Sequence, residues 1–461
     1  MRKQVRRSSW RRAAGAAAVL AALGTAGSQI STRASTFASP IQHVVVIYQE
    51  NHSFDETLGY WCNTFSPARC DGFTGAVRLK DGVVVLMKQS PDVVPEVDHS
   101  VSSQKKAIDA GRMDGWDQIE GCTLDDGYGC LTYYVPGQIP NLTHLAAHFA
   151  VSDRTFSMAD SPSWGGHLYA VAATTDGFTG ENPVADPSIR PGPGWGCDSN
   201  KQTYWVNSSK QALFEPSCVP DPSLHIANGG AYEATPVRYV PTIMDRLKSA
   251  RLSWRLYTAD SSQSEYVWAT CPSFAECLDT PQQRNLVPTD QVISDANAGT
   301  LPNFSLVLPG GGAAAGASQH NGTSMVTGDS WIGKVVSAVE NGPDWSSTAI
   351  FITYDDCGCF YDHVAPGTNP DGSHQGPRMP LVIVSPYVRA GHTDSTVATT
   401  LSILAFTEHA FGLSPLSSND AKAYNYSGSF NYSQTPLAPV PMVQIAPPRG
   451  EVVMPPLDDP T

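Results

Sequence analysis

Residues 43–55 read HVVVIYQENHSFD, an apolar run that ends abruptly in polar and acidic residues. A second stretch has the same design, because residues 349–363 read AIFITYDDCGCFYDH. Continuous apolar, β-branched runs of this length are typical of strands that are covered on both faces of a sheet. The sequence therefore predicts buried strands at His43–Tyr48 and Ala349–Tyr354, each leading into an acidic loop.

Two further apolar runs and four helical patterns lie elsewhere in the chain. Phe304–Leu308 and Pro380–Ser385 predict additional buried strands. Strands that alternate with helices predict an α/β fold with a largely parallel sheet. Apolar residues at helical spacing predict helices over 140–151, 168–174, 331–340 and 397–411.

The rest of the chain shows weaker patterns. Residues 180–300 are rich in Pro, Gly, Trp and Cys, and they predict a loop-rich insertion or cap. Residues 413–461 are polar and then Pro-rich, and they predict a tail that wraps the surface. We therefore expect one domain over residues 35–461.

The composition excludes several classes of protein. Hydrophobic residues make up 41% of the 461 residues, which is normal for a globular interior and excludes disorder throughout. A net charge of -14 argues against a protein that binds nucleic acid by neutralising phosphates. Beyond the N-terminus no segment is long and apolar enough for a multi-span membrane protein.

The N-terminus has the pattern of a targeting signal. Residues 2–12 carry basic charges and no acid, residues 13–26 are apolar, and Thr32-Arg33-Ala34 offers a cleavage site. This order predicts a secretory signal over residues 1–34. A membrane anchor is the alternative, but the apolar run is too short to span a bilayer. We therefore expect a secreted protein, extracellular or periplasmic.

Ten cysteines fit this expectation. Zinc clusters would require CxxC spacings, and none occurs. Short-range disulfides in an oxidising compartment are the simpler interpretation. Cys357 and Cys359 either form a tight local bridge or stay free. The other expected pairs are Cys62–Cys70, Cys122–Cys130, Cys197–Cys218 and Cys271–Cys277.

Acidic side chains follow the two strands quoted first. In parallel α/β sheets functional groups gather at the carboxyl ends of strands. Here one strand is followed by Glu50, Asn51 and Asp55, and the other by Asp355, Asp356, Asp362 and His363. Neighbouring buried carboxylates repel unless a cation lies between them or one is protonated. Such an oxygen-rich set suits a divalent metal ion. The alternative is that these acids cap loops or helices.

Ser163 is a candidate nucleophile, since the stretch 160–167, DSPSWGGH, leads into a predicted helix. A helix N-terminus favours an anion, which would help a serine oxygen attack phosphorus, although a plain N-cap is the commoner role. His99, His320 and His363 lie in polar loops and add weight to the catalytic interpretation. The G-x-S-x-G, H-E-x-x-H and P-loop patterns of other hydrolases are absent.

These motifs resemble the bacterial phosphoesterase family of the alkaline phosphatase-like superfamily, which contains secreted phospholipases C and AcpA-type acid phosphatases. The resemblance implies an alkaline phosphatase-like three-layer α/β/α sandwich with a mostly parallel sheet. The similarity covers roughly residues 40–412. In family order, it continues through residues 98–99, 113–116, 139–157, 161–169, 318–324, 348–364 and 376–391.

The resemblance also implies a role for each residue singled out. Ser163 matches the family's nucleophile, which also faces the metal. One divalent metal ion, whose identity stays open, would be held by Glu50, Asn51, Asp355 and Asp356.

Further residues match the family's phosphate pocket. His99, His320 and His363 would hold phosphoryl oxygens or protonate the leaving group, and Asp362 would orient His363. Trp164, beside the nucleophile, either packs against a choline head group or fills the interior, which we favour.

The chain departs from the family pattern at Gly165-Gly166 and at Cys357-Gly358-Cys359, so the substrate stays open. We predict a secreted metal-dependent hydrolase that forms a phosphoseryl intermediate and resembles acid phosphatases acting on phosphomonoesters. The alternatives are a phospholipase C and a non-catalytic metal-binding module. The expected partner is a phosphoester or phospholipid, with no nucleic acid and at most transient contact with a membrane surface.

Overall fold

A computed structural model of the chain describes residues 39–65, 67–125, 127–221 and 236–449. The predicted signal at residues 1–34 and the last residues of the predicted tail lie outside the described residues. The four predicted strands are present with small shifts of their ends. They are β1 (His43–Gln49), β15 (Phe304–Val307), β16 (Thr348–Tyr354) and β17 (Leu381–Val384).

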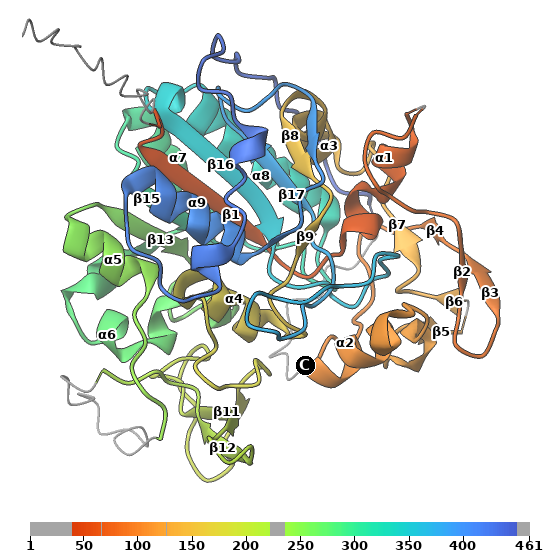
Figure 1. The fold of residues 1–461 in the computed structure, drawn as a ribbon, viewed down its shortest axis with the longest axis horizontal. Coiled ribbons are helices and arrows are strands. Elements are labelled where there is room, and N and C mark those ends of the chain that lie inside the picture. The colour runs from red at the N-terminus through yellow and green to blue at the C-terminus, as the bar shows by residue number, and fades with distance from the viewer. Residues whose placement is uncertain (1–38, 66, 126, 222–235, 450–461) are drawn as a thin grey trace, which may run out of the picture. The chain divides into compact units, whose positions relative to one another are not determined.

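These strands form the middle of an eight-stranded sheet with the order β14-β13-β15-β1-β16-β17-β8-β18 (Figure 1). β17 is antiparallel to both of its neighbours, and the other strands run in one direction. The largely parallel sheet is therefore confirmed. The remaining strands are β8 (Ala150–Ser152), β13 (Trp254–Thr258), β14 (Leu286–Pro288) and β18 (His392–Asp394).

The register of β1 and β16 places their polar ends together. Gln49 pairs with Tyr354, so Glu50 and Asp355 leave the sheet side by side. Every residue of β16 is buried, as its apolar run predicts. The two acidic loops therefore begin at one edge of the sheet.

Two groups of helices cover the faces of the sheet and complete the three-layer α/β/α architecture (Figure 1). One layer contains α3 (Pro140–His148), α7 (Gln291–Ala298) and α8 (Met325–Glu340), and the other contains α4 (Ser163–Ala172), α5 (Ile243–Ala250) and α9 (Leu401–Phe411). The predicted helix over 168–174 begins earlier, at Ser163 itself.

The segment 180–300 is not one insertion. Its first part forms a small antiparallel sheet of β10 (Val184–Ala185), β11 (Lys201–Val206) and β12 (Ala212–Pro216). Its second part supplies β13 and β14 to the main sheet. The polar residue Arg255 interrupts the apolar pattern of β13, which explains the weak signal in the sequence.

All four expected disulfides are present, and Cys357 and Cys359 are buried free thiols. Residues 413–449 contain two short 3-10 turns and lie along the domain. Val443 of this segment, for example, accepts a hydrogen bond from Asn141. The smaller elements are α1 (Tyr60–Asn63), β2 (Ala76–Arg78), β3 (Val84–Leu86), β4 (Lys88–Gln89), α2 (Val101–Ile108), β5 (Thr123–Leu124), β6 (Gly127–Tyr128), β7 (Thr132–Tyr133), β9 (Thr155–Phe156), α6 (Ala275–Leu278) and β19 (Ala398–Thr399).

Candidate active site

Three segments that lie far apart in the sequence meet at the carboxyl ends of β1 and β16. The Oγ of Ser163, the first residue of α4, lies 3.2 Å from Oδ1 of Asn51 and 3.4 Å from Oδ2 of Asp356. The backbone N–H of Asn51 donates to Oδ1 of Asp355 at 2.9 Å. Glu50 and these four residues are almost fully buried. The structure thus brings together the serine and the four predicted metal ligands.

Carboxylate oxygens gather beside Ser163, and those of Glu50 and Asp355 lie within 4.8 Å of each other. The side-chain amide of Asn51 satisfies its neighbours when its nitrogen donates to Asp355 Oδ1 at 3.0 Å and its oxygen accepts from Nε2 of His320 at 2.8 Å. Oε2 of Glu50 has no hydrogen-bond partner among the described residues. Oxygens that converge in this way are the donor set that a divalent cation takes. The residues present therefore fit a metal ion.

The electrostatics of the cluster support the same interpretation. Burial raises the pKa of Glu50 to about 7. Burial and the charge of Glu50 raise the pKa of Asp355 to about 7, and burial and the charge of Asp355 raise the pKa of Asp356. Three buried carboxylates without a nearby cation are costly in their charged form. A bound divalent ion would offset this cost.

His167 belongs to the site, although the sequence analysis assigned it no role. Its Nε2 lies 3.0 Å from Oε1 of Glu50. Possible ligand atoms of Glu50, His167 and Asp355 all lie within 4.8 Å of one another. Burial lowers the pKa of His167 to about 4, so its ring is neutral. The available signal was spacing, because His167 lies four residues after Ser163 and therefore on the same face of α4.

Glycine allows the segments to approach this closely. A Cβ on Gly166 would lie 2.6 Å from the carbonyl oxygen of Asp355. A Cβ on Gly358, where φ is 53°, would lie 2.1 Å from the carbonyl oxygen of Asn51. Gly166 lies in a stretch where the chain departs from the family pattern, and this close contact gives a packing reason for glycine at that position.

Two of the predicted histidines flank Asn51. His99 Nε2 lies 3.2 Å from the side-chain nitrogen of Asn51 and 4.0 Å from Oδ2 of Asp356. Nε2 of His320 lies 2.8 Å from the Asn51 amide. The Nδ1 atoms of His99 and His320 pair with the carbonyl oxygens of Val97 and Asn321. Both rings therefore direct Nε2 toward the cluster.

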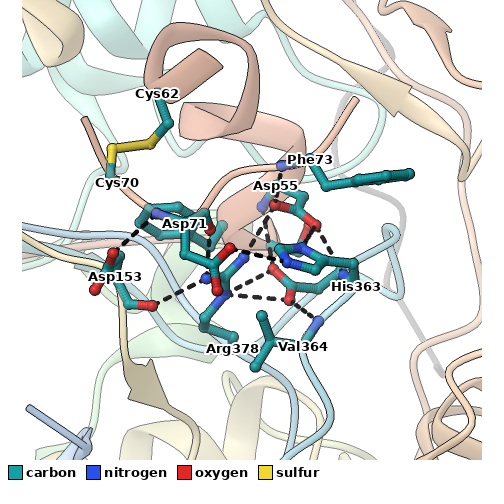
Figure 2. Close-up of polar contacts among 12 residues, drawn as sticks. Asp55, Cys62, Cys70, Asp71, Phe73, Asp153, His363, Val364 and Arg378 are labelled. Atoms are coloured by element: carbon teal, nitrogen blue, oxygen red, sulfur yellow. Dashed lines mark hydrogen bonds and ion pairs between the residues drawn. A yellow bond between two sulfur atoms is a disulfide. The ribbon is translucent and has the colours of Figure 1, made fainter. Parts of the chain in front are cut away.

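The other predicted histidine, His363, lies in a separate ionic cluster (Figure 2). Its Nδ1 lies 2.6 Å from Oδ2 of Asp55, and its Nε2 lies 3.2 Å from Oδ1 of Asp71. The buried Arg378 pairs with Asp55 at 2.9 Å and with Asp362 at 3.1 Å. Although Asp55, Asp362 and His363 have the spacing of a metal site, Arg378 already supplies the positive charge.

We expected His363 and Asp362 to line the phosphate pocket, and the structure shows the polar partners that these two side chains have. Within the described part of the chain, residues 362–363 form hydrogen bonds or ion pairs with Asp55, Asp71, Val364 and Arg378. The backbone turns sharply at Gly358 and Cys359, where φ is 53° and 50°. This turn lies between the acidic pair and residues 362–363.

Trp164 packs in the interior, as we favoured. It is 1% exposed, its Nε1 donates to Oγ of Ser273 at 3.0 Å, and its ring meets Phe178 edge-on. Its backbone N–H donates to Asn182, and that of Gly165 donates to the carbonyl of Gly180. These two backbone N–H groups at the start of α4 are thus already hydrogen-bonded and are not available to bind an anion.

Comparisons with known proteins identify the family to which the chain belongs. The model of the phosphoesterase family matches residues 41–414. Non-specific phospholipase C6 of Arabidopsis thaliana is 25% identical over 456 residues, covering 89% of this chain and 76% of the relative. Non-hemolytic phospholipase C of Pseudomonas aeruginosa is 25% identical over 426 residues, covering 81% of this chain and 54% of the relative.

The solved structure of a Vibrio parahaemolyticus protein in the alkaline phosphatase superfamily is 12% identical in sequence to this chain, with a TM-score of 0.33. The match covers 63% of this chain and 64% of that chain. Within the described residues, the helices are all too short or too polar to cross a membrane.

Proposed function

The chain belongs to the phosphoesterase family and is a hydrolase of phosphoester bonds, and on this premise we propose that Ser163 is its nucleophile in a metal-dependent reaction. One observation carries the proposal. Ser163 Oγ lies within 3.4 Å of both Asn51 and Asp356, two of the side chains that would hold the metal. A serine that served only as an N-cap would not need to face a cluster of oxygens.

The metal ligands and Ser163 have different roles in the proposed reaction. A divalent cation held by Glu50, Asn51, Asp355 and Asp356 would favour the ionised serine and offset charge on the phosphoryl oxygens. Ser163 Oγ forms a bond to phosphorus as the bond to the leaving alcohol breaks, and water then hydrolyses the phosphoseryl group.

The histidines serve the leaving group and the phosphoryl oxygens. Nε2 of His99 and of His320 both face Asn51, next to the serine. Either atom can hold a phosphoryl oxygen, and when protonated it can give its proton to the departing alcohol. The N–H groups of Trp164 and Gly165 are already paired, so they do not take part in this charge stabilisation.

The decisive experiment is Ser163→Ala. We expect a loss of about a thousandfold or more in kcat/KM on p-nitrophenyl phosphate, with an unchanged urea midpoint that excludes unfolding. Retention of more than a tenth of the activity would show that another group attacks phosphorus. A chelator should abolish turnover by the unmodified protein, and added Mn²⁺ or Zn²⁺ should restore it.

The substrate is proposed to be a phosphomonoester, and a phospholipid diester fits about as well because several relatives are named phospholipase C. Parallel assays with p-nitrophenyl phosphate and p-nitrophenyl phosphorylcholine separate the two activities. Turnover of neither ester, with the metal bound, would instead favour the non-catalytic metal-binding module.

We also propose that the protein is secreted. Its four disulfides close within short segments and would persist in an oxidising compartment. Mass spectrometry of protein recovered from the medium or periplasm should show all four bonds and a new N-terminus near residue 35.

A further inference from the structure

The hairpin of β2 and β3 presents an apolar face to solvent. Its inner side is anchored, because Val77 is buried and Val85 packs against the core. Side chains alternate along a strand, so the neighbours of Val85 point outward. Val84 is 53% exposed and Leu86 is 75% exposed, and Val83, directly before β3, is also exposed. Three neighbouring apolar side chains in water require an explanation that a single surface valine does not.

Basic side chains accompany this face. Arg78 lies directly across from Val84 in the hairpin, and Lys88 follows Leu86 two residues later. Neither cation has a carboxylate partner within 4.0 Å among the described residues, whereas the nearby Lys80 pairs with Asp109 at 3.2 Å. Residues 76–88 hold three cations and one acid, Asp81, whose Oδ1 accepts from the N–H of Val83, so this segment is net positive in a protein whose net charge is -14.

We propose that this hairpin docks the protein on an anionic phospholipid surface. Valine and leucine side chains would enter the boundary between head groups and acyl chains, while Arg78 and Lys88 would remain at the level of the phosphates. The charge of these cations complements that of an anionic leaflet. The inference adds an interface to the proposed function and does not depend on the role of Ser163.

The test measures vesicle binding separately from catalysis. Phosphatidylcholine vesicles with and without phosphatidylglycerol are sedimented with the full chain, and turnover of soluble p-nitrophenyl esters is measured in parallel. The double variant Val84→Asp/Leu86→Asp should bind anionic vesicles about tenfold or more weakly. Lys88→Gln should weaken the same binding by about fivefold and leave binding to neutral vesicles unchanged.

Val443→Asp is the matched control, because Val443 is 47% exposed and lies on the C-terminal segment. It should bind vesicles like the unmodified protein, and all variants should keep their turnover of soluble esters. The proposal is overturned if the unmodified protein does not sediment with anionic vesicles, or if the hairpin variants and the control behave alike. It is also overturned if the hairpin variants abolish self-association in size-exclusion chromatography, since the face would then join two copies of the chain.

Failure of the proposed function would give a different result. In that case no variant would turn over soluble esters, whatever its affinity for vesicles.

Discussion

Replacing Gly166 by alanine tests the closeness of α4 to the acidic loop. The added Cβ would lie 2.6 Å from the carbonyl oxygen of Asp355, about 0.8 Å short of an ordinary contact of 3.4 Å. The obstacle is backbone, so no flexible side chain can move aside. Helix α4 must therefore shift away from the strand end, and Ser163 at its first turn shifts with it.

Gly166→Ala is informative because the tight contact should make it lower the free energy of unfolding, whereas the same change in an open helix raises it. In an unobstructed helix, glycine to alanine stabilises by about 1 kcal/mol. Overpacking of a tight interior site costs about 1–3 kcal/mol, so we expect Gly166→Ala to lower the free energy of unfolding by about 1–2 kcal/mol. A displacement approaching 1 Å in a reacting group can reduce kcat/KM by about a hundredfold.

Urea unfolding and kcat/KM on p-nitrophenyl phosphate measure the two effects. Gly137→Ala is the control, because a Cβ at Gly137 would meet nothing within 4 Å. The control should keep both stability and activity. If Gly166→Ala were as stable and as active as the unmodified protein, α4 would not pack on the loop as described, and the geometry assigned to Ser163 would be wrong.

Two further predictions concern His167 and Glu340. His167→Ala should weaken Mn²⁺ binding, measured by calorimetry, by about tenfold to a hundredfold because Oε1 of Glu50 loses its partner. His167→Gln should recover part of the affinity. Unchanged binding by the alanine variant would show that His167 does not belong to the site. Burial raises the pKa of Glu340 to about 8, so the folded state holds a proton that the unfolded state has released. The stability that this group contributes is complete below about pH 4.5 and is lost as the pH rises through 8. In Glu340→Gln the free energy of unfolding, measured by urea at a series of pH values, should fall less over this range, by on the order of 2 kcal/mol. Parallel pH profiles of the two proteins would contradict this assignment.

The central strands and the position of the site followed from the sequence for a simple physical reason. The apolar runs at His43–Tyr48 and Ala349–Tyr354 are long enough to be buried on both faces, and their acidic ends stand out sharply. Parallel pairing then brings Glu50 next to Asp355. Local pattern therefore predicted the strands and their acidic ends, whereas the direct pairing of β1 with β16 is a long-range contact that only the structure shows.

Other features depend on contacts that a linear pattern does not contain. β8 has three residues and directly follows α3, so its apolar residues continued the helical pattern. Spacing places His167 on the same face of α4 as Ser163, but its contact with Glu50 depends on how α4 packs against the end of β1. His363 is only seven residues from Asp356, yet the positive φ angles of Gly358 and Cys359 turn the chain between them.

The cluster around Arg378 fastens the two acidic loops to each other. Its guanidinium group pairs with Asp55, in the loop after β1, and with Asp362, in the loop after β16, and it also donates to the carbonyl oxygens of Asp71 and Asp153. This brace uses a cation that belongs to the polypeptide itself. We therefore expect the two loops to keep their positions without a bound ion, so that a chelator would remove the proposed metal without unfolding the protein and added metal would restore binding.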